Sequence, residues 1–168
     1  MNLADFIRDV PDFPKPGIIF KDIAPLLRDP AAFAEAVAQM KKAAPPCDAV
    51  AALESRGFLF GAPLALALGK PFVPVRKAGK LPGALHAESY ALEYGDATIE
   101  IQRDAIPSGA RVLIVDDVLA TGGTAAAAAR LVERAGGVAA GFVFLLELQF
   151  LHGRERLDLT PAVSLLQY

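Results

Sequence analysis

The sequence predicts one α/β domain in which helices cover both faces of a parallel sheet. Three observations lead to this prediction. Short apolar stretches of strand length alternate with longer stretches of helical length, and glycine or proline stands at most of the boundaries. The chain has 168 residues, which suits a single core. Hydrophobic residues make up 54% and charged residues 21% of it, so the chain is too apolar to be disordered.

The first part of the chain is expected to be mostly irregular. Residues 3–8 have the spacing of a short amphipathic helix. The prolines in residues 11–25 then exclude a regular helix. Asp29 and Pro30 have the order of an N-cap and a first helical turn, so we expect a helix that runs from there until Pro45.

Two apolar stretches and a helix follow. "AVAAL" at residues 49–53 predicts a short buried strand. "GFLFGAPLALALG" at residues 57–69 predicts a helix that ends at Gly69. "FVPV" at residues 72–75 predicts a second buried strand, so this region has the strand–helix–strand order of a parallel sheet.

Residues 76–95 are long, polar and rich in glycine, without a period that assigns an element. Residues 97–102 alternate apolar and polar side chains, as a half-exposed strand does. Residues 111–117 predict a buried strand. The remaining elements are expected to be a helix over residues 124–137 with a stop at Gly136, and strands over residues 138–148 and 161–168.

Charge and composition exclude several classes of function. The net charge of −2 leaves no overall basic field, so nonspecific binding of nucleic acid is not expected. The single cysteine, Cys47, excludes an internal disulfide and fits a reducing compartment. The N-terminal residues lack the apolar core of a signal peptide, and no apolar run reaches membrane-spanning length. We therefore expect a cytoplasmic protein without a membrane partner.

The stretch "VLIVDDVLATGGT", residues 112–124, carries the strongest chemical signal. It runs from a buried strand into Asp116 and Asp117 and then into a small-residue loop before a helix. Ligands of α/β sheets bind at the carboxyl ends of strands, and a glycine loop at a helix N-terminus suits a phosphate. Two acids would repel a bare phosphate, but they can accept hydrogen bonds from hydroxyl groups or from metal-bound water. A sugar phosphate combines both requirements.

An acid pair that only ends a strand, followed by an ordinary turn, is the alternative interpretation. We favour the functional one because acids, loop and helix start are contiguous. The other common phosphate motifs, G-x-x-x-x-G-K-[ST] and G-x-G-x-x-G after a strand, do not occur in the sequence.

The same stretch resembles the phosphoribosyl-pyrophosphate signature of the type I phosphoribosyltransferase family. "DFPKPGIIFKDIAPLLRDP", "LESRGFLFGAPLALALGKPFVPVRKAGKLPG", "SYALEYG" and "SLLQY" resemble the members of that family that act on adenine, so the resemblance covers nearly the whole chain. It implies the type I fold, with a central parallel sheet flanked by helices. It also implies a small hood mainly in residues 1–30, a mobile lid at about residues 80–95 and a homodimer.

The resemblance also implies a role for each site residue. The 5-phosphate would be held by Ala120, Thr121, Gly122, Gly123 and Thr124, and the ribose by Asp116 and Asp117. Pyrophosphate would be bound by Arg56, Gly57, Arg76, Lys77 and Lys80, of which Arg56 and Lys77 are also expected to be catalytic. The acid expected near the purine N7, and so the third catalytic residue, is Glu93. Adenine would be bound by Ile19, Phe20, Lys21, Val118 and Leu119.

For several of these residues a simpler interpretation exists. Arg56 and the "RKAGK" cations could be solvated surface charges, and Glu93 could be an exposed polar residue in a strand pair. Many family members carry arginine at the position of Lys21, so only a main-chain role is carried over there. The family also often has a cis peptide in the pyrophosphate loop, which corresponds to the Glu54–Ser55 bond.

The implied reaction converts adenine and 5-phosphoribosyl 1-pyrophosphate to AMP and pyrophosphate, as a purine salvage enzyme does. Mg²⁺ is the expected cofactor. We expect no direct protein ligand, since the metal would arrive on the donor pyrophosphate and Asp116 or Asp117 could reach it through water. Two alternatives stay open. One is transfer to hypoxanthine, guanine or xanthine, and the other is a non-catalytic regulator that senses a nucleotide. An appended DNA-binding domain or a degraded pyrophosphate loop would favour the regulator, and we expect neither.

Overall fold

The structure is a computed structural model that describes residues 1–92 and 94–168. The chain divides into two compact units, residues 1–39 and residues 40–168. They are called the N-terminal unit and the C-terminal unit below.

The N-terminal unit holds a hairpin and most of a long helix. A short 3-10 helix, η1 (Leu3–Phe6), precedes the antiparallel strands β1 (Arg8–Pro11) and β2 (Ile19–Asp22). Helices α1 (Ala24–Arg28) and α2 (Pro30–Ala43) follow. The predicted start of α2 is confirmed, because the Asp29 carboxylate accepts hydrogen bonds from the main-chain N–H groups of Ala31 and Ala32 at 3.0 and 2.9 Å.

Two expectations for this unit were incomplete. The predicted helix over residues 3–8 is a single 3-10 turn, and Arg8 already belongs to β1. The proline-rich segment is not irregular throughout, because its first three prolines lie in and around the turn of the β1–β2 hairpin and leave β2 free to pair, while the fourth, Pro25, lies in the first turn of α1. The Phe13–Pro14 peptide bond in this turn is cis.

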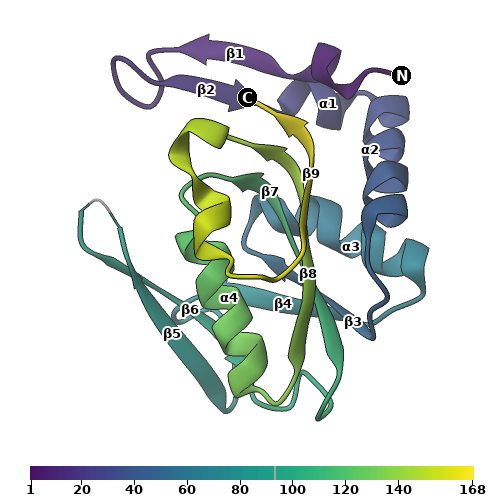
Figure 1. The fold of residues 1–168 in the computed structure, drawn as a ribbon, viewed down its shortest axis with the longest axis vertical. Coiled ribbons are helices and arrows are strands. Elements are labelled where there is room, and N and C mark those ends of the chain that lie inside the picture. The colour runs from purple at the N-terminus through teal and green to yellow at the C-terminus, as the bar shows by residue number, and fades with distance from the viewer. Residues whose placement is uncertain (93) are drawn as a thin grey trace. The chain divides into compact units, whose positions relative to one another are not determined.

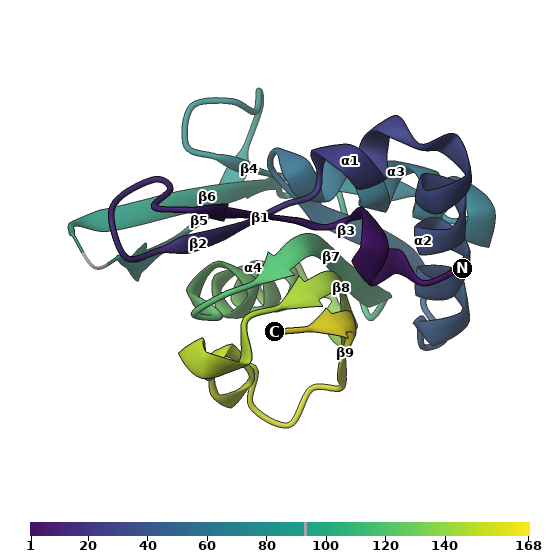
Figure 2. The same ribbon diagram turned by 90° about the horizontal axis from the view of Figure 1, so that it is seen from above.

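The C-terminal unit is an α/β sheet of seven strands in the order β5-β6-β4-β3-β7-β8-β9 (Figures 1 and 2). The strands that pair in parallel are β3 (Ala49–Leu53), β4 (Phe72–Lys77), β7 (Arg111–Leu119), β8 (Val138–Glu147) and β9 (Ala162–Gln167). All five residues of β3 are buried, as are residues 112–115 of β7, which matches their unbroken apolar sequences.

Helices α3 (Arg56–Leu68) and α4 (Gly123–Arg134) lie on opposite sides of this sheet (Figures 1 and 2). The reason is topological. From β3 the chain crosses to β4 on one side, and from β7 it crosses to β8 on the other. Right-handed crossovers in opposite directions place their helices on opposite faces. The point between β3 and β7 is therefore the switch point where open α/β sheets bind ligands.

The expectation for residues 76–95 needs a correction. They are not a loop throughout, because β5 (Leu85–Ala91) pairs antiparallel with β6 (Asp96–Gln102), and β6 pairs antiparallel with β4. The sheet is thus mainly and not wholly parallel. The sequence "LHAESYA" gave no clear alternation because only one face of this edge hairpin is partly covered.

Two short 3-10 helices, η2 (Gln149–Leu151) and η3 (Gly153–Arg156), join β8 to β9 and were not predicted. The other predicted elements of the C-terminal unit are confirmed to within two residues, except that α4 ends at Arg134, three residues before the end of its predicted range. The glycine stop of α3 is confirmed as well, since Gly69 adopts a φ of 64° and donates its N–H to the last turn.

Candidate functional site

A cleft of about 660 Å³ lies at the carboxyl ends of β3 and β7, on both sides of the switch point. Residues from five strands, from the loops that follow them and from the first turns of α3 and α4 form its wall. They are Leu53, Glu54, Ser55, Arg56, Lys77, Ala78, Tyr90, Ala97, Thr98, Ile99, Asp116, Asp117, Val118, Ala120 and Thr124. The cleft therefore brings together charged and hydroxyl side chains that are far apart in the sequence.

The junction between β3 and α3 supplies a guanidinium to this cleft. The Glu54–Ser55 peptide bond is cis, as the family resemblance implied. Arg56 is the first residue of α3, and its Nε lies 2.8 Å from Oδ2 of Asp117 on β7. Gly57 is needed at its position, because a Cβ there would lie 2.8 Å from Oδ1 of Asp116. The α3 N-terminus is thus packed directly against the acid pair.

Glu54 is held in place by the neighbouring strand. Arg76 on β4 donates from Nε to Glu54 Oε1 at 2.6 Å, and the Lys77 N–H donates to Oε2 at 3.2 Å. Burial acts to raise the pKa of Glu54, but these two hydrogen bonds and the Arg76 charge outweigh it and lower the pKa. Glu54 therefore remains a carboxylate whose charge is neutralised by Arg76.

The two acids lie within β7, which continues for two residues beyond them to Leu119. Asp117 is 3% exposed, and within the described residues its Oδ2 is a buried oxygen without a hydrogen bond, although Arg56 is close. Asp116 is partly exposed in the cleft. Burial and the charge of Asp117 raise the pKa of Asp116 well above its usual range. A ligand that donates hydrogen bonds to this pair would favour its ionised form.

The junction between β7 and α4 is built from main-chain groups. A second cavity of about 70 Å³ is lined by residues 120–124 together with Asp116, Val118, Leu119 and Ala125. Gly122 is the N-cap residue of α4 and has no side chain with which to cap the helix. The N–H groups of the first helical turn therefore face the loop, where the helix dipole favours an anion.

Two residues that support this junction, Gly153 and Tyr90, were missed by the sequence analysis. Gly122 has a φ of +83°, and a Cβ on it would lie 2.3 Å from the carbonyl oxygen of Gly153, so η3 supports the loop from behind. Tyr90 on β5 accepts a hydrogen bond from the Thr124 hydroxyl at 2.8 Å. The "HG" pair at residues 152–153, where η3 begins, is a local signal for a tight turn. Nothing in the sequence around Tyr90 indicated its contact with Thr124.

The structure brings together most of the predicted site residues of the C-terminal unit. Arg56, Lys77, Asp116, Asp117 and the loop of residues 120–124 line one or both cavities. Gly57 packs beneath them.

Three other residues of this unit are placed differently. Within the described residues, Arg76 and Lys80 are not among those that line the cleft, and Arg76 is paired with Glu54. Val118 lines both cavities, whereas Leu119 lines the second one, is 1% exposed and belongs to the core. Glu93 lies outside the described residues.

The predicted base-binding residues of the N-terminal unit lie on β2. Ile19 is 57% exposed, and Lys21 donates from Nζ to the Asp9 carboxylate on β1 at 2.6 Å. The Phe20 ring makes an edge contact with Phe13, with 5.2 Å between the centroids. Lys21 thus has a side-chain partner inside its own unit, which is compatible with a purely main-chain role toward a ligand.

In residues 1–92 and 94–168, no group of three or more His, Cys, Asp or Glu side chains is arranged to hold a metal ion. No helix in this part of the chain is both long and apolar enough to cross a lipid bilayer.

Comparisons with known proteins assign the fold and site to a family. A family model described as a phosphoribosyl transferase domain matches residues 26–159. The adenine phosphoribosyltransferase of Kosmotoga olearia is 54% identical, with both chains covered completely. The crystal structure of the enzyme from Thermoanaerobacter pseudethanolicus is 51% identical, covers 99% of this chain and 100% of its own, and superposes with a TM-score of 0.96.

A further similar protein was solved with ligands bound. The Saccharomyces cerevisiae adenine phosphoribosyltransferase, solved with adenine and an imino-altritol bisphosphate, is 46% identical with a TM-score of 0.91 and covers 97% of this chain and 96% of its own. Sequence identity this high over complete chains, together with the two cavities described above, establishes the family of this chain. The chain belongs to the phosphoribosyltransferase family, among the adenine phosphoribosyltransferases.

Proposed function

We propose that this chain transfers the phosphoribosyl group of 5-phosphoribosyl 1-pyrophosphate to adenine, giving AMP and pyrophosphate in purine salvage. The observation that carries the proposal is the pair of strand–loop–helix junctions on either side of the switch point, with the acid pair between them. A donor with a phosphate at one end and a pyrophosphate at the other matches two anion sites that flank a hydroxyl-binding site.

The chemistry follows from the charges in the cleft. Adenine N9 attacks the anomeric carbon while the bond to pyrophosphate breaks, so positive charge builds on the ribose ring and negative charge on the leaving group. Arg56 and Lys77 line the cleft and would stabilise the leaving pyrophosphate. Asp116 and Asp117 would accept hydrogen bonds from the ribose hydroxyl groups and lie near the developing positive charge. A covalent protein nucleophile is not needed.

The N–H groups at the start of α4, with the Thr121 and Thr124 hydroxyls, would hold the 5-phosphate. Because this loop is small and fixed, it would serve as the anchor from which the anomeric carbon is positioned. Arg76 would act indirectly, since its charge neutralises Glu54 beside the pyrophosphate site.

Mg²⁺ is the proposed cofactor, carried by the donor pyrophosphate. Mg²⁺ usually keeps several waters and binds through one or two carboxylates plus substrate phosphates. Asp116 and Asp117 fit this pattern, because burial and the charge of Asp117 raise the pKa of Asp116, so that a nearby cation would favour the ionised form of the pair. When bound, the metal would offset charge on the pyrophosphate.

Recognition of the base is proposed to use main-chain groups of Ile19 and Lys21. Residues two apart in a strand point their main-chain N–H and C=O groups to the same side, so this pair can read one edge of a ring. Phe20 would stack on the purine, with Val118 as a further wall. Adenine offers a donor at N6 and an acceptor at N1, whereas hypoxanthine and guanine offer the reverse. A rigid main-chain pair can match only one pattern.

Other features stay proposals from the family resemblance. Glu93 would lie near the purine N7, Lys80 and Gly57 would contribute to pyrophosphate binding, and residues 1–30 would form the hood. The mobile lid is proposed for the part of residues 80–95 that precedes β5. We further propose a homodimer in the cytoplasm, where the buried single thiol of Cys47 stays reduced.

One assay tests the proposed function. The protein is incubated with the ribosyl donor and Mg²⁺, and with adenine, hypoxanthine, guanine or xanthine in turn, and nucleotide formation is measured. We expect AMP formation with adenine at a catalytic efficiency higher by several powers of ten than with the other bases. Preference for another base would support the alternative enzyme, and binding of the donor without any turnover would support the regulator.

A further inference from the structure

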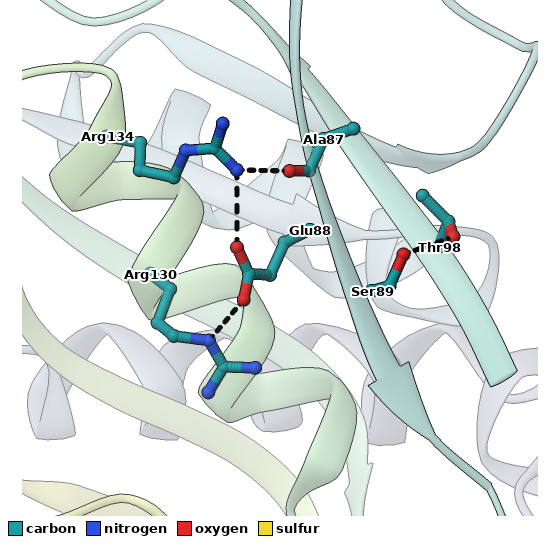
Figure 3. A network of polar contacts seen from close by, with 6 residues as sticks. All are labelled: Ala87, Glu88, Ser89, Thr98, Arg130 and Arg134. Carbon is teal, nitrogen blue, oxygen red and sulfur yellow. Dashed lines mark hydrogen bonds and ion pairs between the residues drawn. The ribbon is translucent and has the colours of Figure 1, made fainter.

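The β5–β6 hairpin is fastened to α4 by charged side chains (Figure 3). Glu88 on β5 accepts from Nε of Arg130 at 2.6 Å, and Nη1 of Arg134 lies 3.3 Å from its other oxygen. Arg134 also donates to the main-chain carbonyl of Ala87. The helix whose N-terminus forms the phosphate loop therefore carries the hairpin along its side.

Two residues further along β5, Tyr90 reaches the phosphate loop itself. Its ring is partly buried against the core, and a Cβ on Gly123 would lie 3.2 Å from the ring carbon Cδ2. The Thr124 hydroxyl donates to the Tyr90 hydroxyl at 2.8 Å, and both residues line the cleft. The position of the Tyr90 hydroxyl is thus set by the ring packing and by the Glu88 contacts, independently of any ligand.

This hydrogen bond conflicts with phosphate binding as it stands. A hydroxyl has one proton to donate, and Thr124 gives it to Tyr90. A phosphate monoester dianion offers only acceptors, so Thr124 must turn its proton toward the phosphate. The Thr124 oxygen can then accept a hydrogen bond, and at this contact the donor is the phenolic O–H of Tyr90.

We infer that Tyr90 is a positioning residue of the phosphate site, an inference that rests on the proposed function. Its hydroxyl changes from acceptor to donor when a phosphate binds, and so holds the Thr124 hydroxyl in the orientation that donates to the 5-phosphate. The resulting chain, from Tyr90 O–H through Thr124 O–H to the phosphate oxygen, has each bond polarising the next. Tyr90 itself acts through Thr124 and not on the reacting atoms.

The test compares the binding of AMP and of adenine by isothermal titration calorimetry. Tyr90→Phe keeps the ring and removes the hydroxyl. We expect it to weaken AMP binding by about three- to tenfold, the range of one neutral hydrogen bond, and to leave adenine binding unchanged. The matched control is Ser89→Ala, which removes the 2.8 Å hydroxyl contact with Thr98 on the same hairpin and should leave AMP affinity unchanged (Figure 3).

A double-mutant cycle separates positioning from packing. In a Thr124→Val background, or in Thr124→Ala if the valine variant does not fold, Tyr90→Phe should have no further effect on AMP binding. An equal effect in both backgrounds, or unchanged AMP affinity in Tyr90→Phe alone, would overturn the inference. Equal weakening of adenine would overturn it too, since this would indicate a general disturbance of the cleft. Failure of the unmutated protein to bind AMP would instead refute the proposed function.

Discussion

The β3–α3 and β7–α4 junctions have the same order of strand, loop and helix, yet they are built from different chemistry. The first presents the guanidinium of Arg56 and a fixed Glu54–Arg76 pair. In the second, residues 120–124 carry no charged side chain, and the helix N-terminus provides the positive potential. One junction depends on side-chain charge and the other on main-chain shape.

The difference matches what each junction is proposed to bind. A pyrophosphate leaves with growing negative charge, which a forked guanidinium can follow. A 5-phosphate keeps its charge during the reaction and only needs to be held, for which fixed N–H groups suffice. The comparison therefore predicts that the first junction is sensitive to loss of charge and the second to loss of shape.

The largest effect is expected for Arg56→Ala. It should lower kcat/KM for the ribosyl donor by about a hundredfold or more, because the leaving group loses its guanidinium. It should also lower the melting temperature, since Asp117 keeps a buried charge without its partner. Steady-state kinetics and thermal melting measure the two effects. Arg56→Lys is the control, and it should recover most of the stability but less of the activity, because ammonium lacks the forked geometry.

Asp116→Asn should separate activity from stability. Donor use should fall by about ten- to a hundredfold, as expected when hydrogen bonds to a charged group are lost. Stability at neutral pH should rise by about 1 kcal/mol, because the negative charge that Asp117 repels is removed. The pKa of Asp116 is raised in the folded state. The destabilisation by its charge is therefore absent below the ordinary pKa of 3.8, grows as the pH rises and is complete above the pKa of the folded state.

The stability difference between Asp116→Asn and the unmutated chain should therefore vanish near pH 3 in denaturant titrations, well below the ordinary pKa of 3.8. Asp117→Asn is the matched comparison. It loses attraction to Arg56 and repulsion by Asp116 together, so its melting temperature should stay nearly unchanged while donor use falls strongly. A variant that melts far earlier but turns over normally would show that these acids serve the fold.

Gly122→Ala tests the dependence of the second junction on shape. The substitution forces a side chain into a φ of +83° and against the Gly153 carbonyl, so we expect about 2–3 kcal/mol of destabilisation and weaker AMP binding. Gly109→Ala is the control, because its φ of +78° is similar but nothing lies within 4 Å of the new Cβ. If both variants lose the same stability, the contact with Gly153 contributes nothing.

The smallest effect is expected for Glu88→Gln, which loosens the hairpin from α4. The Arg130 hydrogen bond, with help from Arg134, lowers the pKa of Glu88 below its ordinary value of 4.5. The stabilisation is therefore complete above pH 4.5 and is lost as the pH falls through the folded value. Because both arginines are about half exposed, we expect only about 0.2–1 kcal/mol by denaturant titration at pH 7.

The matched control for Glu88→Gln is Glu133→Gln, which removes the same charge from an exposed position on α4. It should leave the stability unchanged at pH 7 and at pH 3. A difference for Glu88→Gln that persists unchanged at pH 3 would show that packing, and not the ion pairs, holds the hairpin.

Much of the site could be predicted because its parts are local. The buried strand before Asp116 and Asp117, the small-residue loop and the start of α4 follow one another directly, and the rules for strands, glycine turns and helix starts operate over a few residues. The same holds for β3 and Arg56. A sheet of alternating strands and helices then has to bring such strand ends to one edge.

The sequence by itself determined most elements of the C-terminal unit, the place of the two strand–loop–helix junctions and the family. Only the tertiary structure decided the partners: Arg76 with Glu54, Tyr90 with Thr124, and Gly122 with Gly153. These pairs are 22 to 34 residues apart in the chain, and β5 itself became a strand only through its pairing with β6. Side-chain periodicity and turn chemistry carry no information over such separations, because the contacts exist only once the sheet has set its strand order and register.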